Sequence, residues 1–383
     1  MHNDPIFRLG LGCMRFPSKL GQTDMEKTEA IILTAVAEGI NFFDTAFIYP
    51  GSEVALGKVV AKNNLRHQIY IATKLPLFKC HKYEDFDRIF NAQLANLQTD
   101  YIDYYFMHHV TKLEDLRRME ALGIKDWLAK KQAAGQIRKV GFSFHGMQGE
   151  FLQLIDAFDW DFAMIQYNYM NVNYQAGVTG LKHAASKNIP VFVMEPLLGG
   201  RLATGLPKEA AALLTPTGKT PAQWALAWLY NQPEVTMVLS GMGSPAQIKE
   251  NAAGARNYPP HCLSQAEIDT LAQVAEVFEK TYKIPCTSCN YCLPCPAKIN
   301  IPDSFNAYNA SYAVSRFTGI QQYATTSGGL SRGFSVYDCI HCGKCEKACP
   351  QEIKIMAELK NVGKRMEPWW FRAGIGLARK FMK

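Results

Sequence analysis

Residues 41–49 read Asn-Phe-Phe-Asp-Thr-Ala-Phe-Ile-Tyr, an apolar run that ends at an aspartate and is soon followed by a tyrosine. Residues 41–45 are typical of a short buried β-strand. Seven further runs rich in β-branched or aromatic residues have the same character. They cover Arg8–Cys13, Ile69–Lys74, Tyr104–His108, Lys139–Phe144, Ala163–Tyr167, Pro190–Glu195 and Thr236–Gly241.

Longer helical patterns separate these strand candidates. They include Asp24–Glu38, Glu84–Leu97, Leu113–Ala134, Val178–Lys187 and Pro221–Asn231. Eight strand–helix units in this length predict an α/β fold of the (β/α)8 TIM barrel type rather than an open sheet. No Gly-x-Gly-x-x-Gly motif follows an early strand, which argues against a dinucleotide-binding Rossmann domain.

A pair of cysteine runs is the second decisive feature. They read C-T-S-C-N-Y-C-L-P-C-P from residue 286 and C-I-H-C-G-K-C-E-K-A-C-P from residue 339. Two such runs, each ending in Cys-Pro, are the ligation pattern of a protein with two [4Fe–4S] clusters, in which the last cysteine of each run crosses to the other cluster. One cluster would then be held by Cys286, Cys289, Cys292 and Cys349, and the other by Cys295, Cys339, Cys342 and Cys345.

Zinc and disulfides are the alternative interpretations of these cysteines. Zinc sites usually need only two pairs of ligands, often with histidine, and eight cysteines exceed that need. Disulfides would require export, and the first residues, Met-His-Asn-Asp-Pro, do not resemble a signal segment. We therefore expect iron–sulfur clusters in a reducing, cytoplasmic compartment.

Composition narrows the class of protein further. The chain has 383 residues, a hydrophobic content of 48% and a formal net charge of +7. Two clusters with eight thiolates would offset about 4 of these charges, so the charge gives no case for nucleic acid. No stretch approaches the roughly 20 apolar residues of a membrane span.

The ends of three predicted strands carry side chains that suit carbonyl chemistry. Asp44 ends one strand and Tyr49 follows it, Lys74 ends the next, and His108 ends the one after. The carboxyl ends of barrel strands carry the active site. A lysine ammonium near a tyrosine lowers the pKa of the phenol, which can then give a proton to a carbonyl oxygen as hydride arrives. Taken singly, each residue fits a cap, a loop, a surface charge or a core histidine equally well; their joint occurrence favours catalysis.

The same region resembles the aldo-keto reductase family. The resemblance rests on Phe43-Asp44-Thr45-Ala46-x-x-Tyr49, Gly51-Ser52-Glu53, Thr73-Lys74, Asp103-x-x-x-x-His108, Val140-Gly141-Phe142-Ser143, Gln166-Tyr167-Asn168, Pro196-Leu197-x-Gly199-Gly200 and Ser240-Gly241. With the cysteine region, the chain is similar to a bacterial branch that adds a ferredoxin-like segment to this barrel. The resemblance implies an NAD(P)-dependent oxidoreductase acting on a small carbonyl or alcohol. Tyr49 would be the proton donor, Asp44 and Lys74 would tune its pKa, and His108, rather than His109, would orient the substrate.

The resemblance also implies where a nicotinamide cofactor binds. Ser143 and Gln166 match positions that hold the carboxamide, and Ser240, Gly241 and Met242 match positions near the phosphates and adenosine. Gln247 and Asn251 match positions near the adenine end. The family often has an arginine where this chain has Gln247, and a neutral amide cannot make a charge-assisted pair with a 2′-phosphate. NAD is therefore at least as plausible a cofactor as NADP. Many members also read Ser-Asn where this chain reads Ser143-Phe144-His145.

These patterns predict a barrel over residues 1–256, a bridging helix over 257–281, a two-cluster ferredoxin-like domain over 282–352 and a helical tail over 353–383. Residues 297–338, between the cysteine runs, are expected to form helices that pack over the clusters. The tail's basic amphipathic pattern favours packing on the protein itself over membrane contact.

Hydride carries two electrons and each cluster carries one, so the clusters could serve an external electron carrier or only hold their domain folded. The alternative function is an iron–sulfur electron-transfer or redox-sensing protein with a non-catalytic barrel. The sequence does not indicate an oligomeric state.

Overall fold

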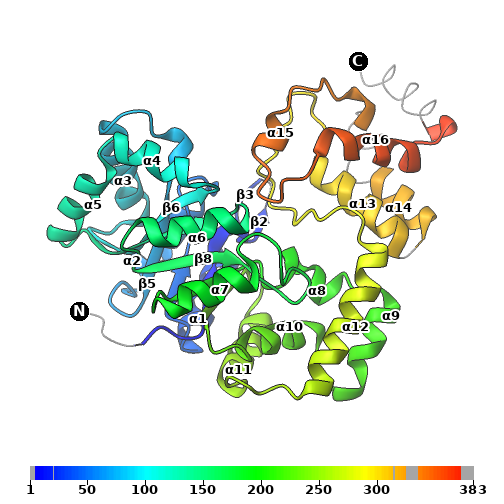
Figure 1. Cartoon of the computed structure of the whole chain (residues 1–383), viewed down its shortest axis with the longest axis horizontal. Helices are drawn as coiled ribbons and strands as arrows, with labels where there is room; N and C mark the ends of the chain where they lie inside the picture. Colours follow the sequence, from blue (N-terminus) through cyan, green and yellow to red (C-terminus); the bar gives the residue numbers. More distant parts are fainter. Residues whose placement is uncertain (1–4, 20, 314, 325–334, 372–383) are drawn as a thin grey trace. The chain divides into compact units, whose positions relative to one another are not determined.

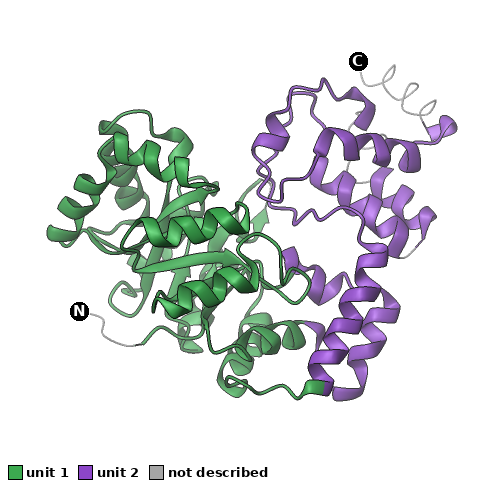
Figure 2. Ribbon diagram, in the orientation of Figure 1, with its two compact units in different colours: residues 1–197, 222–265 green, residues 198–221, 266–383 purple. Residues whose placement is uncertain are grey.

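The computed structural model describes residues 5–19, 21–313, 315–324 and 335–371. Its contacts divide the chain into two compact units, which Figure 2 colours separately. Unit 1 comprises residues 1–197 and 222–265, and unit 2 comprises residues 198–221 and 266–383. No helix among the described residues is long and apolar enough to cross a membrane.

Unit 1 is a closed barrel of eight parallel strands (Figure 1). The strands are β1 (Leu9–Gly12), β4 (Phe42–Asp44), β5 (Tyr70–Pro76), β6 (Ile102–Val110), β7 (Ile137–Phe144), β8 (Phe162–Gln166), β9 (Val191–Met194) and β10 (Val235–Ser240). Each overlaps one of the eight predicted strands, and β1 closes the barrel by pairing with both β4 and β10. The predicted (β/α)8 fold is confirmed. The two-residue strands β2 (Ser18–Lys19) and β3 (Gln22–Thr23) form a separate hairpin.

Helices surround the barrel strands. They are α1 (Met25–Ala37), α2 (Ser52–Lys62), α3 (Glu84–Leu97), α4 (Leu113–Ala121), α5 (Ile124–Ala133), α6 (Gln148–Ala157), α7 (Gly177–Ser186), α10 (Pro221–Tyr230) and α11 (Pro245–Asn257). The prediction of one helix over 113–134 was wrong, because the chain breaks it into α4 and α5 at Gly123. Gly123 has φ +88°, a left-handed conformation that glycine adopts without steric cost.

Aromatic and aliphatic side chains fill the barrel interior. Phe42, Phe106, Phe162 and Phe192 pack together, with the rings of Phe162 and Phe192 stacked at a centroid distance of 5.2 Å. Side chains two residues apart on a strand point to the same face of the sheet. The inward face of each strand can therefore be followed from this core to the strand's carboxyl end.

A buried carboxylate near the amino end of β6 links neighbouring strands. Asp103 is 1% exposed, and its two oxygens lie 2.8 Å from Arg66 Nη2 and 2.8 Å from Arg138 Nη1. The same carboxylate accepts a hydrogen bond of 2.9 Å from the backbone N–H of Ile71 on β5. Asp103 thus ties β5, β6 and β7 together at the end opposite the predicted site.

Unit 2 is helical in its described part. Its helices are α8 (Arg201–Thr204), α9 (Lys208–Leu214), α12 (Gln265–Thr281), α13 (Ile301–Ala313), α14 (Arg316–Gln322), α15 (Lys344–Lys347) and α16 (Ile355–Met366). Residues of α13 and α16 form a core that also contacts cysteines of both runs, including Cys292 and Cys345. The helices α13 and α14 lie within the predicted helical segment between the runs. The helix α16 lies within the predicted helical tail over 353–383, and residues 372–383 of that tail lie outside the described residues.

Candidate active site and cluster cavities

The predicted catalytic residues continue the inward face of the barrel strands. Each of the three strand residues among them lies two positions after an interior residue of the same strand. Asp44 comes after Phe42, Lys74 after Ala72 and His108 after Phe106. This spacing turns all three side chains toward the barrel axis at the carboxyl ends of β4, β5 and β6. Tyr49 comes from the loop between β4 and α2.

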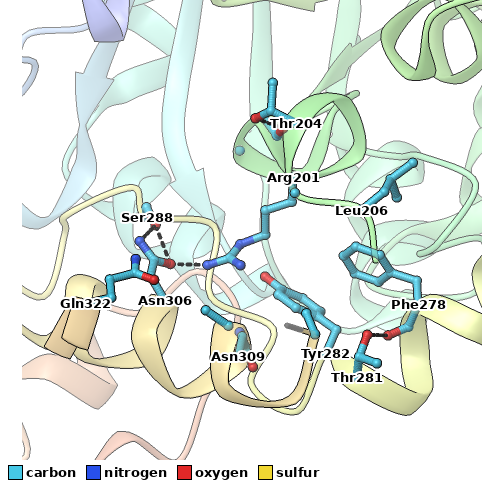
Figure 3. A pocket seen from close by; sticks show the side chains of 15 residues that line it. Arg201, Thr204, Leu206, Phe278, Thr281, Tyr282, Ser288, Asn306, Asn309 and Gln322 are labelled. Carbon is cyan, nitrogen blue, oxygen red and sulfur yellow. Dashed lines mark hydrogen bonds between the residues drawn. The ribbon is translucent and has the colours of Figure 1, made fainter. Parts of the chain in front are cut away.

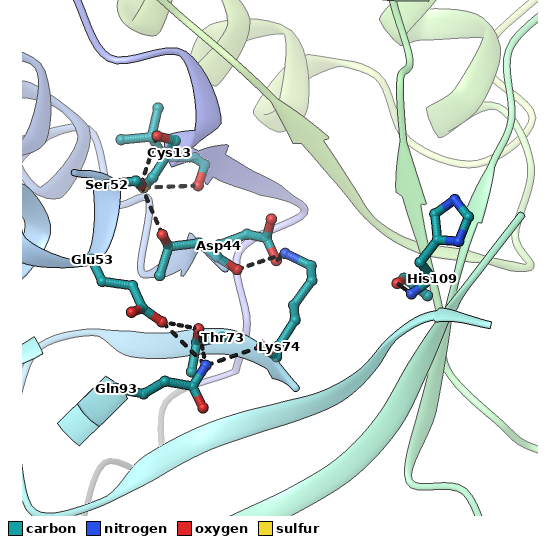
Figure 4. Close-up of polar contacts among 11 residues, drawn as sticks. Cys13, Asp44, Ser52, Glu53, Thr73, Lys74, Gln93 and His109 are labelled. Atoms are coloured by element: carbon teal, nitrogen blue, oxygen red, sulfur yellow. Dashed lines mark hydrogen bonds and ion pairs between the residues drawn. The ribbon is translucent and has the colours of Figure 1, made fainter. Parts of the chain in front are cut away.

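The structure brings these four side chains together. Lys74 Nζ lies 2.5 Å from Asp44 Oδ1 and also donates a hydrogen bond of 2.7 Å to the carbonyl of Thr45 (Figure 4). The same ammonium lies 5.1 Å from the centre of the Tyr49 ring. The ring of His108 approaches Tyr49 edge-on, with 6.0 Å between centroids. A phenol flanked by an ammonium and an imidazole is an arrangement that can pass a proton to a carbonyl oxygen.

Burial sets the protonation of these groups. It lowers the pKa of Lys74 and raises the pKa of Asp44, and their ion pair opposes both shifts. Burial, with Lys74 nearby, lowers the pKa of His108 well below its ordinary 6.5. His108 is therefore a neutral imidazole at neutral pH and can offer one N–H to a substrate oxygen.

A buried amide network fixes the backbone that carries the lysine. Gln93 Nε2 donates to the carbonyl of Lys74 at 3.0 Å and to Thr73 Oγ1 at 3.0 Å (Figure 4). Tyr105 donates its hydroxyl to Gln93 Oε1 at 2.8 Å, and Glu53 accepts from Thr73 Oγ1 at 2.6 Å. The sequence resemblance marked Glu53 and Thr73, but Gln93 on α3 carries no motif and was missed.

His145 is a second residue that sequence reasoning left without a role. It is 5% exposed and follows β7, and its ring stacks on that of His109 at a centroid distance of 4.9 Å. No hydrogen-bond partner for His145 Nδ1 lies among the described residues. Burial, with His109 and Lys74 nearby, lowers the pKa of His145 well below 6.5. The departure Ser143-Phe144-His145 from the usual Ser-Asn was the signal that pointed to it.

The predicted nucleotide-binding residues lie at the same ends of their strands or just beyond. Gln166 and Ser240 are the last residues of β8 and β10, and both are buried. Ser143, near the end of β7, accepts a hydrogen bond of 3.0 Å from the backbone N–H of His109. Gly241 and Met242 lead into α11, which carries Gln247 and Asn251.

Gln247 is exposed in the first turn of α11. Its side-chain carbonyl accepts a hydrogen bond of 2.8 Å from the backbone N–H of Gly243. Gln247 supplies no positive charge at this helix start, so a 2′-phosphate would find no guanidinium there.

The cysteines of unit 2 line two separate cavities. About 310 Å³ of space without atoms lies in and around the first cavity and about 350 Å³ in and around the second, part of it open solvent. The first is lined by Cys286, Cys289, Cys292 and Cys349. The second is lined by Cys295, Cys339, Cys342 and Cys345, together with Cys292 from the first set. The first cavity therefore receives one cysteine from the second run, and the second cavity receives two from the first run, a lining that agrees with the predicted crossed arrangement.

Both cavities combine cysteine thiols with apolar walls. Among the described residues, no three cysteine, histidine or carboxylate side chains converge closely enough to hold one metal ion. Apolar side chains, including Ile301 at both cavities, line the remaining walls. Burial raises the pKa of the Cys292 thiol, and the neighbouring thiols Cys286, Cys289 and Cys349 raise it further. The ionised thiol would need a cationic partner such as iron at this position.

Comparison with known proteins identifies the class of both regions. Residues 8–276 match the model of the aldo/keto reductase family, and residues 285–354 match a 4Fe-4S dicluster domain. The chain belongs to the aldo/keto reductase family and is an NAD(P)-dependent oxidoreductase with a C-terminal iron–sulfur domain.

Individual relatives are distant. The chain is 26% identical to L-galactose dehydrogenase of Arabidopsis thaliana, over 72% of this chain and 91% of that protein. It is 27% identical to D-galacturonate reductase of Fragaria ananassa, over 70% and 86% of the two chains. Its structure resembles an aldo-keto reductase of Klebsiella pneumoniae solved with NADPH, with a TM-score of 0.57 and 23% identity over 70% of this chain and 91% of that one. At that identity the structural likeness supports the fold alone.

Proposed function

We propose that the chain reduces a small carbonyl compound, or oxidises the corresponding alcohol, with Tyr49 as the proton donor and NADPH or NADH as the hydride source. The observation that carries this proposal is the convergence of Lys74, Asp44 and His108 on the Tyr49 ring. Lys74 holds positive charge beside the phenol, and Asp44 keeps that ammonium in place. Neutral His108 orients the carbonyl oxygen so that the Tyr49 proton reaches it.

The nicotinamide site in this proposal lies across the ends of β7, β8 and β10. Ser143 and Gln166 hold the carboxamide, and Ser240, Gly241 and Met242 face the phosphates and adenosine. Asn251 and Gln247 lie toward the adenine. The start of α11 offers backbone N–H groups to the anionic part of the nucleotide. The two relatives named above include a dehydrogenase and a reductase, and the solved neighbour contains NADPH, which agrees with this class of cofactor.

Two [4Fe–4S] clusters occupy the cysteine cavities in this proposal, within a domain over residues 282–352 that follows the barrel of residues 1–256. At least four cysteines and an apolar wall line each cavity, which supports the donor set that such a cluster requires. Cys342 is exposed and its neighbour Ile340 is 64% exposed. A cluster near this surface can exchange single electrons with an external carrier, which favours a relay over a purely structural role.

The test of the catalytic assignment is Tyr49→Phe, which removes the phenolic proton and keeps the ring. We expect kcat for carbonyl reduction to fall by about 10²–10⁴-fold, while the affinity for NADPH and NADH stays unchanged. Tyr101→Phe is the matched control, because Tyr101 lies beside Arg66 and Arg138 and away from the four residues. Unchanged reduction by the Tyr49 variant would refute the assignment and would favour an electron-transfer protein with a non-catalytic barrel.

A further inference from the structure

A third cavity lies entirely within unit 2. It opens to solvent, has a volume of about 440 Å³, and is formed mainly by α8, α12, α13 and the first cysteine run. Figure 3 shows the side chains of Arg201, Tyr282, Phe278 and Asn306 around it. Its size is in the range of sites for small molecules and cofactors. Neither the catalytic residues nor the cluster cysteines use this space.

Among the described residues that line the cavity, Arg201 is the only charged one. Its Nε donates a hydrogen bond of 3.1 Å to the carbonyl of Cys286, and its Nη2 contacts Asn306 Oδ1. No carboxylate forms an ion pair with Arg201 within the described part of the chain. A partly buried guanidinium without a carboxylate partner favours an anionic ligand.

Aromatic rings form one wall of the same cavity. Phe278 and Tyr282 lie one turn apart at the end of α12, with 4.8 Å between their ring centroids. The Arg201 guanidinium lies over the Tyr282 ring, 4.7 Å from its centre. This wall can take the flat face of a ring system, while the polar groups Ser288 and Asn306 face the opposite side (Figure 3).

Contacts join this cavity to the loop that carries the first cluster's cysteines. Arg201 and Tyr282 both donate to the carbonyl of Cys286, the latter at 2.7 Å. Ser288 lines this cavity, while the preceding Thr287 lines the first cysteine cavity. Gly199 packs so closely on Thr287 that a Cβ at residue 199 would lie 2.4 Å from the Thr287 carbonyl oxygen. A ligand in this cavity would therefore lie on the other side of the 286–288 loop from the first cysteine cavity.

We propose that this cavity binds a flavin, with an anionic group of the flavin paired to Arg201 and its ring system against Phe278 and Tyr282. The inference rests on the proposed function, because hydride carries two electrons and each cluster accepts one. Flavins are the class of cofactor that handles both. The unpaired charge, the aromatic wall and the contact with the cysteine loop are the features that such a cofactor needs. All residues that line the proposed flavin site belong to unit 2.

The test is binding of flavin mononucleotide to the cluster-loaded full chain under anaerobic conditions, followed by the flavin fluorescence. We expect saturable binding to one site per chain. Arg201→Gln should weaken it by at least about 10-fold, which is the effect of losing one charge-assisted contact, and Arg201→Lys should restore part of it. Ala310→Trp places a large side chain at the cavity and should abolish binding without touching Cys286. Arg117→Gln, on the exposed part of α4, is the control and should bind like the wild type.

Iron content and carbonyl reduction separate the two proposals. Absence of flavin binding in protein with full iron content and NADPH-dependent reduction would overturn the flavin site and leave the proposed function intact. Displacement of bound flavin by NADPH at equal concentration would also overturn it, because the cavity would then belong to the nicotinamide site. Binding that is equally tight in the Ala310→Trp variant would place the flavin elsewhere.

Discussion

The crossed pairing of the cysteines can be tested by removing two cysteines at a time. Cys286 lines the first cavity with Cys349, from the distant run, whereas Cys295, from its own run, lines the second cavity. In the crossed arrangement, Cys286→Ala with Cys349→Ala removes two ligands from one cluster and leaves the other intact. Cys286→Ala with Cys295→Ala removes one ligand from each cluster.

The expected numbers follow directly from this geometry. The wild type should hold about 2 reducible [4Fe–4S] clusters and about 8 irons per chain. The first double variant should keep about 1 intact cluster and about 4 irons, and the second should keep no intact four-iron cluster. The assay is anaerobic reconstitution, iron determination and electron paramagnetic resonance after reduction, with spins counted per chain.

The uncrossed arrangement predicts the opposite outcome for the two double variants. One intact cluster in the Cys286/Cys295 variant and none in the Cys286/Cys349 variant would refute our reasoning. Cys262→Ala is a suitable control, because Cys262 lines neither cysteine cavity. Zinc in place of iron in the wild type, at about 1 ion per cavity, would reject the cluster assignment altogether.

Three further predictions concern unit 1. Asp103→Asn should lower the free energy of unfolding by about 3 kcal/mol, because it breaks two ion pairs to a buried carboxylate. Urea unfolding measures this free energy, and the control substitution of the exposed Asp159, Asp159→Asn, should change it little. Gln247→Arg should raise the ratio of kcat/KM for NADPH over NADH by about 10-fold or more, and an unchanged ratio would place the 2′-phosphate elsewhere. The pKa of His108 is lower in the folded than in the unfolded chain, so the unfolded state binds more protons and stability falls as pH drops below about 6.5. At pH 5.5, His108→Gln should reduce the loss in the free energy of unfolding by about 1.4 kcal/mol. The same pH dependence of stability in the wild type and the variant would contradict the lowered pKa of His108.

The barrel could be predicted because its strands are short, apolar and separated by helices of regular period. All eight predicted strands occur, and α3 begins and ends at the predicted residues. The break between α4 and α5 at Gly123 was not predicted. It depends on a left-handed backbone conformation, which a single glycine within a helical pattern does not predict. The hairpin of β2 and β3 is held by two residues on each side, too few for a periodic signal.

The candidate site was predictable only where a residue type has a strong chemical reason to stand at a strand end. Asp44, Lys74 and His108 lie at positions of their strands that face the barrel interior. The alternation of side chains that predicts the strands therefore also brings these three residues together. Gln93 is different, because it acts through an amide buried against the backbone of another element. The cavity at Arg201 was likewise hidden, because it is formed by segments that lie far apart in the sequence.

The division of the chain into two units has a consequence for truncated forms of the protein. The polypeptide passes between the two units at residues 197–198, 221–222 and 265–266, because the segment between β9 and α10 belongs to unit 2. Cutting the gene after residue 265 would therefore not release a self-contained barrel. It would strip residues 198–221 of the partners against which they pack.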